Sequence, residues 1–450
     1  MGRMYFCGVK HTIKEWMKSE NKKTMVLLLL IEVMFFLFVM YKGLGKNYLP
    51  ITVVLSLFTA VGCALVFYWK ADRYLLVIAV LLVNIGFVIQ EISESGMEVS
   101  KFLLKFSVAA VVMFLTPFLY HFFLKMLTYD VVVYGIMAVQ ILICLFLCFW
   151  GNMVGDAKNQ GATLTLGIGK LSITAFEIVK VLYLFSASAL LSKGGVKRVC
   201  IRGRWVSGED ILIVHTICLS VFFLFCNELG TLLIVYLTGL LMLWVFGEKK
   251  RRNFIILIVT LVGIVAIWMV CYFVLFPKIQ EGSIALPAVI QKVVGRFGTT
   301  LHPERDIKGK GYQGILGLEA LAVGGAFGIG TERHRLPLPE ASTDMIFANV
   351  VQTCGFFMGA VIIIAYILLV QRGVKIALNC KDMYSQQHAL AITLVFALEG
   401  VIHIGYNITL LPIMGIPLYF VSQGFTAIVT SMAMIGVLFV VSVRAGKWRK

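Results

Sequence analysis

Long apolar segments follow one another along most of the chain, and they limit its possible folds more than any other feature. A helix that crosses the hydrocarbon core of a bilayer needs roughly 20 mostly apolar residues. About 12 such segments occur, at 24–41, 50–69, 74–92, 102–124, 131–150, 174–192, 210–226, 229–246, 254–276, 345–370, 388–411 and 420–443. Because lipid cannot hydrogen-bond the backbone, each is predicted to be a helix. The sequence therefore predicts an all-α, polytopic integral membrane protein.

Charged residues make up only 14% of the chain, compared with about 25% in soluble domains, and this excludes a soluble enzyme. The formal net charge of +17 would suggest a nucleic-acid partner in a soluble protein. Here the basic residues gather in alternate connections between the apolar segments, which is the pattern of cytoplasmic loops. With a cytoplasmic N-terminus, these positions are Lys10, Lys14, Lys18, Lys22, Lys23, Lys70, Arg73, Lys125, Lys193, Lys197, Arg198, Arg202, Arg204, Lys249, Lys250, Arg251, Arg252, Arg372, Lys375, Lys381, Arg444, Lys447, Arg449 and Lys450. Both termini are thus predicted to be cytoplasmic, and no nucleic acid is expected.

One connection, at 277–343, is far longer than the others. Loops of more than about 15 residues are usually functional or disordered, and the charged and glycine-rich content of this one favours a functional outer loop. The N-terminus does not resemble a cleaved signal, so the first apolar segment is expected to remain as a helix. The predicted parts are a basic N-terminus (1–23), N-terminal membrane helices (24–150), core helices (151–276), the large outer loop (277–343), further core helices (344–443) and a basic tail (444–450).

Two groups of polar residues lie inside predicted spans, where each charge costs at least ~2.5 kcal/mol unless it is paired. Glu177 and Lys180 are close enough in sequence to pair on one helix face. They form either a structural ion pair or a lining for a charged lipid headgroup, with Lys180 facing its phosphate. Glu399, His403 and Asn407 recur once per helical turn as a polar stripe. Such a stripe is typical of polar contacts between membrane helices.

The segment Leu338–Phe347 offers a candidate for acid–base chemistry. In one interpretation, Ser342 or Thr343 is the N-cap of the following helix, and the carboxylates of Glu340 and Asp344 suit the positive end of its dipole. In the other, Asp344 lies at the outer membrane boundary, faces a cavity under the long loop and takes a proton from a hydroxyl group. The residues alone leave both interpretations open.

The segment Asn407–Thr426 is expected to be non-helical in part. Pro412, Gly415 and Pro417 interrupt a helix at membrane depth. Irregular backbone is tolerated at that depth only when it is buried in protein or lines a cavity. The segment is therefore predicted to form a wall of the same outer cavity as Asp344.

Taken in order, these motifs resemble the SEDS family (shape, elongation, division and sporulation), which includes RodA, FtsW and SpoVE. The similar elements are Gly161-Ala162 with Glu177 and Lys180; Asn227–Thr231; Arg296 with Pro303, Asp306 and Gly311–Gln313; Pro339–Asp344 with Ile346–Ala348; and Asn407-Ile408 with Leu411-Pro412, Gly415, Pro417-Leu418, Phe420 and Ser422. Each element is weak alone, but their shared order and spacing are specific. They cover the chain from about Gly161 to the C-terminus. The resemblance implies a ten-helix core, here with about two additional N-terminal spans.

The resemblance implies a peptidoglycan glycosyltransferase at the outer face of the bacterial cytoplasmic membrane, acting in elongation, division or sporulation. Its substrate would be lipid II, the undecaprenyl-pyrophosphate-linked disaccharide-peptide. Asp344 matches the family aspartate that is expected to deprotonate the 4-hydroxyl of the acceptor sugar, so that the donor reacts with inversion. The implied substrate-binding residues are Glu177, Lys180, Arg296, Glu340, Ser342, Thr343, Asn407 and Ser422. Arg296, Lys180 or a divalent cation (Mg²⁺ or Mn²⁺) would stabilise the pyrophosphate, with no organic cofactor. The implied partner is a class B penicillin-binding protein, a transpeptidase.

Several family positions differ in this chain. The histidine of the family's H-T-D is Ser342, E-E-L-G corresponds to Gln352–Gly355, and S-Y-G-G-S corresponds to Ser422–Thr426. Two alternatives therefore stay open. One is a flippase for the lipid-linked precursor that uses the polar stripe as its path, and the other is a non-catalytic scaffold that recruits a transpeptidase.

Overall fold

The computed structural model describes residues 19–41, 45–93, 99–154, 165–168, 171–192, 199–201, 204–226, 228–284, 286–300, 302–306, 310–330 and 335–447. Some positions used in the predictions lie outside the described residues, namely residues 1–18, Gly161-Ala162, Lys193, Lys197, Arg198, Arg202, Asn227 and residues 448–450.

Helices fill most of the described chain and follow the apolar segments, because a helix satisfies its own backbone. Their bounds are α2 (Ser19–Tyr41), α3 (Gly45–Trp69), α4 (Arg73–Ser93), α5 (Val99–Met126), α6 (Asp130–Val154), α7 (Ala175–Leu191), α8 (Gly208–Phe225), α9 (Leu229–Phe246), α10 (Lys250–Val270), α11 (Phe276–Gln280), α12 (Ala288–Gly298), α13 (Lys310–Gly324), α14 (Ile346–Asn379), α15 (Met383–Asn407) and α16 (Phe425–Lys447). Within the described residues, ten helices are long and apolar enough to cross a membrane. The remaining predicted segments, 24–41 and 174–192, form α2 and α7, so a total of about 12 spans stays a prediction.

The fold also contains two short antiparallel hairpins that the all-α prediction does not include. β1 (Thr165–Ile168) pairs with β2 (Leu171–Thr174), and β3 (Val199–Ile201) pairs with β4 (Arg204–Val206). Both lie in connections between helices, and they are rich in the β-branched residues that suit strands. The backbone N–H of Thr174 donates to Thr426 Oγ1 at 2.8 Å, which attaches the first hairpin to the start of α16.

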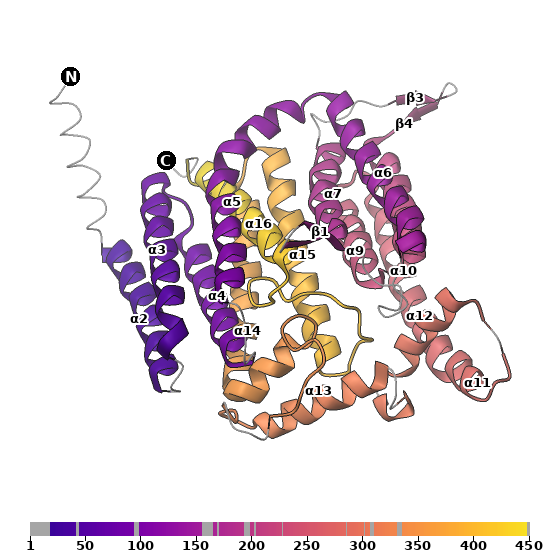
Figure 1. Ribbon diagram of the computed structural model, residues 1–450. Coiled ribbons are helices and arrows are strands. Elements are labelled where there is room, and N and C mark those ends of the chain that lie inside the picture. The colour runs from indigo at the N-terminus through magenta and orange to yellow at the C-terminus, as the bar shows by residue number, and fades with distance from the viewer. Residues whose placement is uncertain are drawn as a thin grey trace.

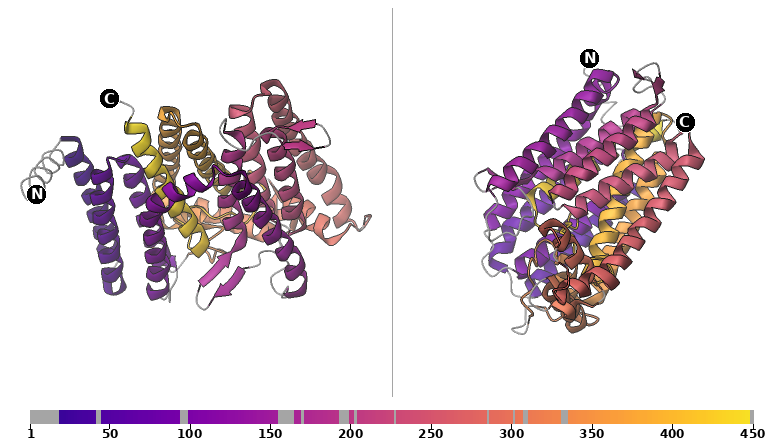
Figure 2. Two further views of the ribbon diagram at one scale, coloured as in Figure 1. Left: turned by 90° about the horizontal axis from the view of Figure 1, so that it is seen from above. Right: turned by 90° about the vertical axis from the view of Figure 1, so that its right-hand side faces the viewer.

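The N-terminal helices α2 and α3 form one edge of the bundle, against α4 (Figure 1). Inside this pair, Thr59 Oγ1 donates to Glu32 Oε1 at 2.7 Å, so an acidic group within the spans has a partner. Figures 1 and 2 place α2 and α3 on the opposite side of the bundle from α10. The predicted additional spans are thus separated from most elements that carry candidate site residues.

The long segment 277–343 is largely helical rather than irregular. It contains most of α11, then α12, a 3-10 turn at Pro303–Asp306 and α13. These elements lie across one end of the bundle (Figure 1). α13 packs along α14, and α12 carries Arg296. That this end is the outer one stays a prediction.

Helix α14 is broken near its start, at Gly355, whose φ of 84° and ψ of 175° are non-helical. The backbone N–H groups of Ile329 and Gly330 donate to the carbonyls of Gln352 and Thr353 at 2.9 and 3.0 Å. The glycine-rich segment after α13 thereby replaces helical bonds that the break removes. This agrees with the rule that irregular backbone at membrane depth is sealed by protein.

Candidate functional site

Hydrogen bonds to three consecutive backbone carbonyls hold the segment Ser342–Asp344 in place. The Ser342 carbonyl accepts from the backbone N–H of Gln423 at 2.9 Å and from Nε2 of Gln90 at 3.3 Å. The Thr343 carbonyl accepts from Ser422 Oγ at 3.2 Å, and the Asp344 carbonyl accepts from Asn407 Nδ2 at 3.0 Å. The donors come from α4, from α15 and from the segment between α15 and α16. Distant parts of the chain therefore fix the position of the predicted catalytic residue.

The start of α14 differs from the predicted cap. Met345 occupies the N-cap position, and its side chain makes no cap hydrogen bond, so the N-cap interpretation of Ser342 and Thr343 is wrong. Instead, Thr343 Oγ1 donates to Glu340 Oε2 at 3.0 Å, and Glu340 adopts a left-handed φ of 50°. These contacts close a turn before the helix.

Asp344 is half-buried and faces the non-helical segment after α15. Its Oδ2 atom lies 3.6 Å from the position of a Cβ built on Gly415, where φ is 70°. The next carbonyl, of Ile416, accepts from His403 Nδ1 at 2.7 Å and from the Tyr406 hydroxyl at 2.5 Å. Side chains of α15 thus satisfy the irregular backbone beside Asp344. The expected proximity of these two segments is confirmed.

The polar stripe of α15 contacts three other elements. Glu399 pairs with Lys180 of α7, His403 binds the segment between α15 and α16, and Asn407 binds the start of α14. The prediction that the stripe makes polar contacts between elements is confirmed. Because each member has a protein partner and is fully buried, the stripe offers little lining for a translocation path.

A buried ion cluster joins α7, α15 and the following segment. Lys180 Nζ lies 2.6 Å from Glu177 Oε1, also bonds Glu399 Oε1, and donates to the Tyr419 hydroxyl at 3.1 Å. The Tyr419 hydroxyl in turn donates to Glu177 Oε2 at 2.7 Å. The predicted ion pair is confirmed, and it is part of a larger cluster. The Lys180 side chain is 3% exposed, and its three ammonium hydrogens all have partners, so its contact with a phosphate stays a prediction.

Glu228 and Arg296 lie in the same electrostatic environment as Asp344. Glu228 is the N-cap residue of α9 and is 8% exposed, and its Oε1 atom has no hydrogen-bond partner among the described residues. Burial raises the pKa of Glu228 to about 7, although the nearby Arg296 and Lys180 favour its charged form. Burial lowers the pKa of Arg296, which interacts with the charges of Glu228 and Asp344. Two carboxylates therefore interact electrostatically with one guanidinium in a poorly solvated place.

Sequence reasoning missed several residues of this region. Glu228 belongs to a quoted motif but received no role, and Tyr419 and Gln90 received none. The signal for Glu228 was available, because an acid directly before an apolar helix suits the helix dipole. No sequence pattern indicates that Tyr419 reaches Glu177, since 242 residues separate them.

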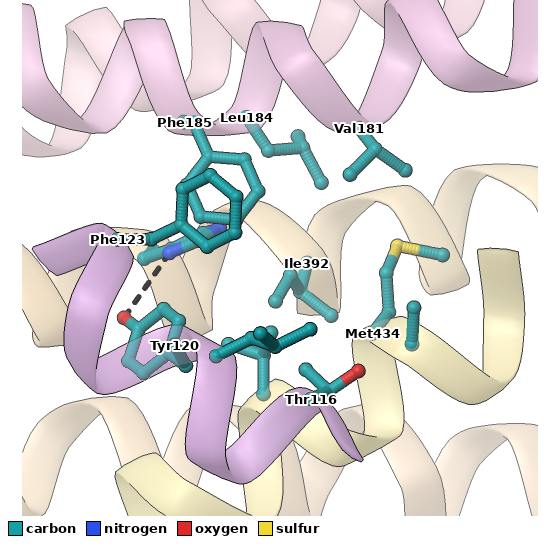
Figure 3. Close-up of a pocket in the computed structure, with 12 residues that line it drawn as sticks. Thr116, Tyr120, Phe123, Val181, Leu184, Phe185, Ile392 and Met434 are labelled. Carbon is teal, nitrogen blue, oxygen red and sulfur yellow. Dashed lines mark hydrogen bonds between the residues drawn. The ribbon is translucent and has the colours of Figure 1, made fainter. Parts of the chain in front are cut away.

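A separate apolar pocket lies between α5, α7, α15 and α16, and it encloses about 150 Å³. Figure 3 shows Phe123, Val181, Leu184 and Ile392 around it. Its polar atoms are few, and the Tyr120 hydroxyl bonds His388 Nδ1 at 3.1 Å. None of the predicted substrate-binding residues lines this pocket.

The chain is similar to several characterised proteins. It is 28% identical over 293 residues to Stage V sporulation protein E of Bacillus subtilis, covering 64% of this chain and 73% of that protein. It is 26% identical over 309 residues to the probable peptidoglycan glycosyltransferase FtsW of Bacillus subtilis, covering 68% of this chain and 72% of that protein. A solved structure described as "Structural coordination of polymerization and crosslinking by a peptidoglycan synthase complex" has a TM-score of 0.61 and 21% identity, covering 84% of this chain and 99% of that one.

The family comparison covers most of the membrane region. Residues 72–447 match the model of the FtsW, RodA and SpoVE family, which is described as "Cell cycle protein". The match begins at the connection before α4, so α2 and α3 lie outside it. With ten helices in its described part that can cross a membrane, the chain is a multi-pass membrane protein. The chain belongs to the FtsW, RodA and SpoVE family.

Proposed function

We propose that this protein polymerises lipid II into glycan strands at the outer face of the cytoplasmic membrane, with Asp344 as the catalytic base. Family membership and the names of the relatives support the reaction class. One observation carries the assignment of the residue. The carbonyls of Ser342–Asp344 are bonded from three elements, while the Asp344 side chain is half-buried and its carboxylate lies beside Gly415.

The proposed reaction needs a base at a fixed place. Asp344 takes the proton from the 4-hydroxyl of the acceptor sugar as that oxygen attacks the anomeric carbon of the donor. The undecaprenyl pyrophosphate then leaves from the opposite face, so the configuration inverts. A general base contributes typically 10²–10⁴-fold to such a rate. Fixing the backbone of Asp344 limits the freedom of the carboxylate before the substrates arrive.

Arg296 is the cation that we assign to the pyrophosphate. It lies on α12, and its electrostatic interactions with Glu228 and Asp344 support this assignment. Lys180 is already bonded to two carboxylates and a hydroxyl. We assign Glu228 to orienting Arg296, and Ser342, Thr343, Ser422 and Asn407 to positioning Asp344. Glu340 closes the turn before α14.

A divalent cation is compatible with this site only if the substrate supplies some of its ligands. No group of three or more His, Cys, Asp or Glu side chains within the described part of the chain is arranged to hold a metal. Mg²⁺ commonly binds one or two carboxylates together with substrate phosphates and water. Asp344 and Glu228 would supply such carboxylates, and the ion would neutralise charge on the leaving pyrophosphate.

The lipid substrate and the protein partner belong to the same proposal. In the proposed orientation, the apolar pocket between α5, α7, α15 and α16 lies towards the cytoplasmic ends of these helices, so we assign it no role in the outer site. The structural relative is part of a complex whose description includes crosslinking. This supports a class B penicillin-binding protein as the partner. The basic connections support our proposal that both termini lie in the cytoplasm.

Purified protein in detergent, supplied with lipid II, tests the proposed activity. We expect glycan strands, resolved as a ladder on a gel, with or without the transpeptidase partner. A flippase yields no glycan in detergent, because it only moves its substrate. A scaffold yields none either, so the absence of glycan in both conditions would overturn the proposal.

A further inference from the structure

Two thiols from different helices face one another at one end of the bundle. Cys148 of α6 and Cys226 at the C-cap of α8 are 78 residues apart in sequence, and their sulfur atoms are 3.0 Å apart. The Cys148 thiol also lies 3.9 Å from the carbonyl oxygen of Phe222 in the last turn of α8. It is thus directed at the end of that helix.

The pair lies at the edge of the membrane rather than at its centre. Cys148 is the next-to-last residue of the span Asp130–Phe149, and Cys226 directly follows the span Gly208–Phe225. In the proposed orientation this edge faces the outside, where disulfides form and persist. Both residues are half-buried, so neither is sealed inside the bundle.

We propose that Cys148 and Cys226 are joined by a disulfide bond in the cell. The bond forms by thiol–disulfide exchange with an oxidised dithiol protein outside the membrane. One thiolate attacks the disulfide of that protein, and the second thiolate then displaces it from the mixed disulfide. The two cysteines lose two protons and two electrons, and the oxidant is reduced to its dithiol.

Such a bond would act on the proposed active site through the turn between α8 and α9. Cys226 lies two residues before Glu228, which interacts electrostatically with Arg296 and Asp344. The bond would tie this turn to α6. Burial and neighbouring acidic groups raise the pKa of the Cys226 thiol, so the reactive thiolate is scarce. This is why a protein catalyst, rather than dissolved oxygen, is named as the oxidant.

Differential alkylation of the full-length protein in cells tests the inference. One reagent blocks free thiols under denaturing conditions, a reductant then opens disulfides, and a second reagent marks the released thiols. Mass spectrometry should find the second label on Cys148 and Cys226 in equal amounts. Cys218, which is on the same helix as Cys226 and is half-buried, should carry the first label and serves as the control. In Cys226→Ser, Cys148 should change to the first label.

The inference is overturned if both cysteines carry the first label in untreated cells, even where an azo-type thiol oxidant added to the cells joins them. The inference relies on the proposed orientation but not on catalysis. The experiment measures the oxidation state of the cysteines and not glycan formation. A negative result would therefore not contradict the polymerase proposal, and a loss of polymerase activity would not change the labelling.

Discussion

Two acidic regions lie close together in this protein, and they differ in their access to solvent. In the cluster of Glu177, Lys180, Glu399 and Tyr419, every ammonium hydrogen has a partner and the groups are almost inaccessible to solvent. In the region of Glu228, Arg296 and Asp344, the Arg296 and Asp344 side chains are only half-buried. The first arrangement suits a structural role, and the second suits binding and proton transfer.

Lys180→Met should disrupt the buried ion cluster and have the largest effect on stability. It would leave two buried carboxylates without their cation, which costs about 3–5 kcal/mol of stability. We expect loss of the monodisperse peak in detergent size-exclusion chromatography. The triple variant Lys180→Met, Glu177→Gln, Glu399→Gln removes the uncompensated charge and should recover the peak. If Lys180→Met alone stays fully folded but inactive, the structural assignment of the cluster is wrong.

Arg296→Ala should lower the catalytic activity assigned to the region of Glu228, Arg296 and Asp344 without unfolding the protein. Loss of one preorganised charge at a developing anion typically lowers kcat by about 10²–10³-fold. Polymerisation rates at saturating lipid II provide the measurement. Arg305→Ala is the matched control, because Arg305 lies on the same long segment but stacks on Tyr272. Equal losses in both variants would remove Arg296 from the site.

Glu228→Gln should change how the stability of the folded protein depends on pH. Because burial raises the pKa of Glu228 from 4.5 to about 7, the folded state favours the protonated acid. Its contribution to stability is full below pH 4.5 and is lost as the pH rises through 7. The change is on the order of 3 kcal/mol at most. As the pH rises from 5 to 8, the variant should become more stable than wild type, measured as the melting temperature in detergent. An identical pH profile in both proteins would refute the buried-acid assignment.

Asn407→Ala should have the smallest effect of this series. It removes hydrogen bonds to the Asp344 and His403 carbonyls and one from the Ala348 N–H, at about 1–3 kcal/mol for the groups left unsatisfied. We expect a lower kcat with KM little changed, since the base is displaced rather than the substrate-binding charge. A change in KM alone would mean that Asn407 contacts substrate and does not position Asp344.

Much of the fold follows from local pattern. The apolar segments predict the membrane helices, because their lengths match the bilayer and lipid forces helical backbone. The prolines and glycine at 412–417 predict the non-helical segment beside Asp344. The ion pair of Glu177 and Lys180 follows from their spacing on one helix.

The contacts that assemble the site could not be predicted in this way. The bond from Gln90 to the Ser342 carbonyl joins residues 252 positions apart, and Lys180 and Glu399 are 219 positions apart. Such contacts depend on how the helices pack against one another. The polarity pattern of a single helix does not predict that packing. The N-cap prediction at Ser342 or Thr343 failed for a related reason. Ser422 and Gln423 hold their carbonyls, so the chain turns once more before α14 begins.

The most direct test compares lipid II polymerisation by wild type, Asp344→Asn and the control Glu319→Gln, which alters an exposed carboxylate on α13. Each purified protein is first matched for its melting temperature in detergent. We predict a loss of at least about 10²-fold in glycan formation for Asp344→Asn and none for Glu319→Gln. Glycan ladders of normal yield from folded Asp344→Asn would contradict the account.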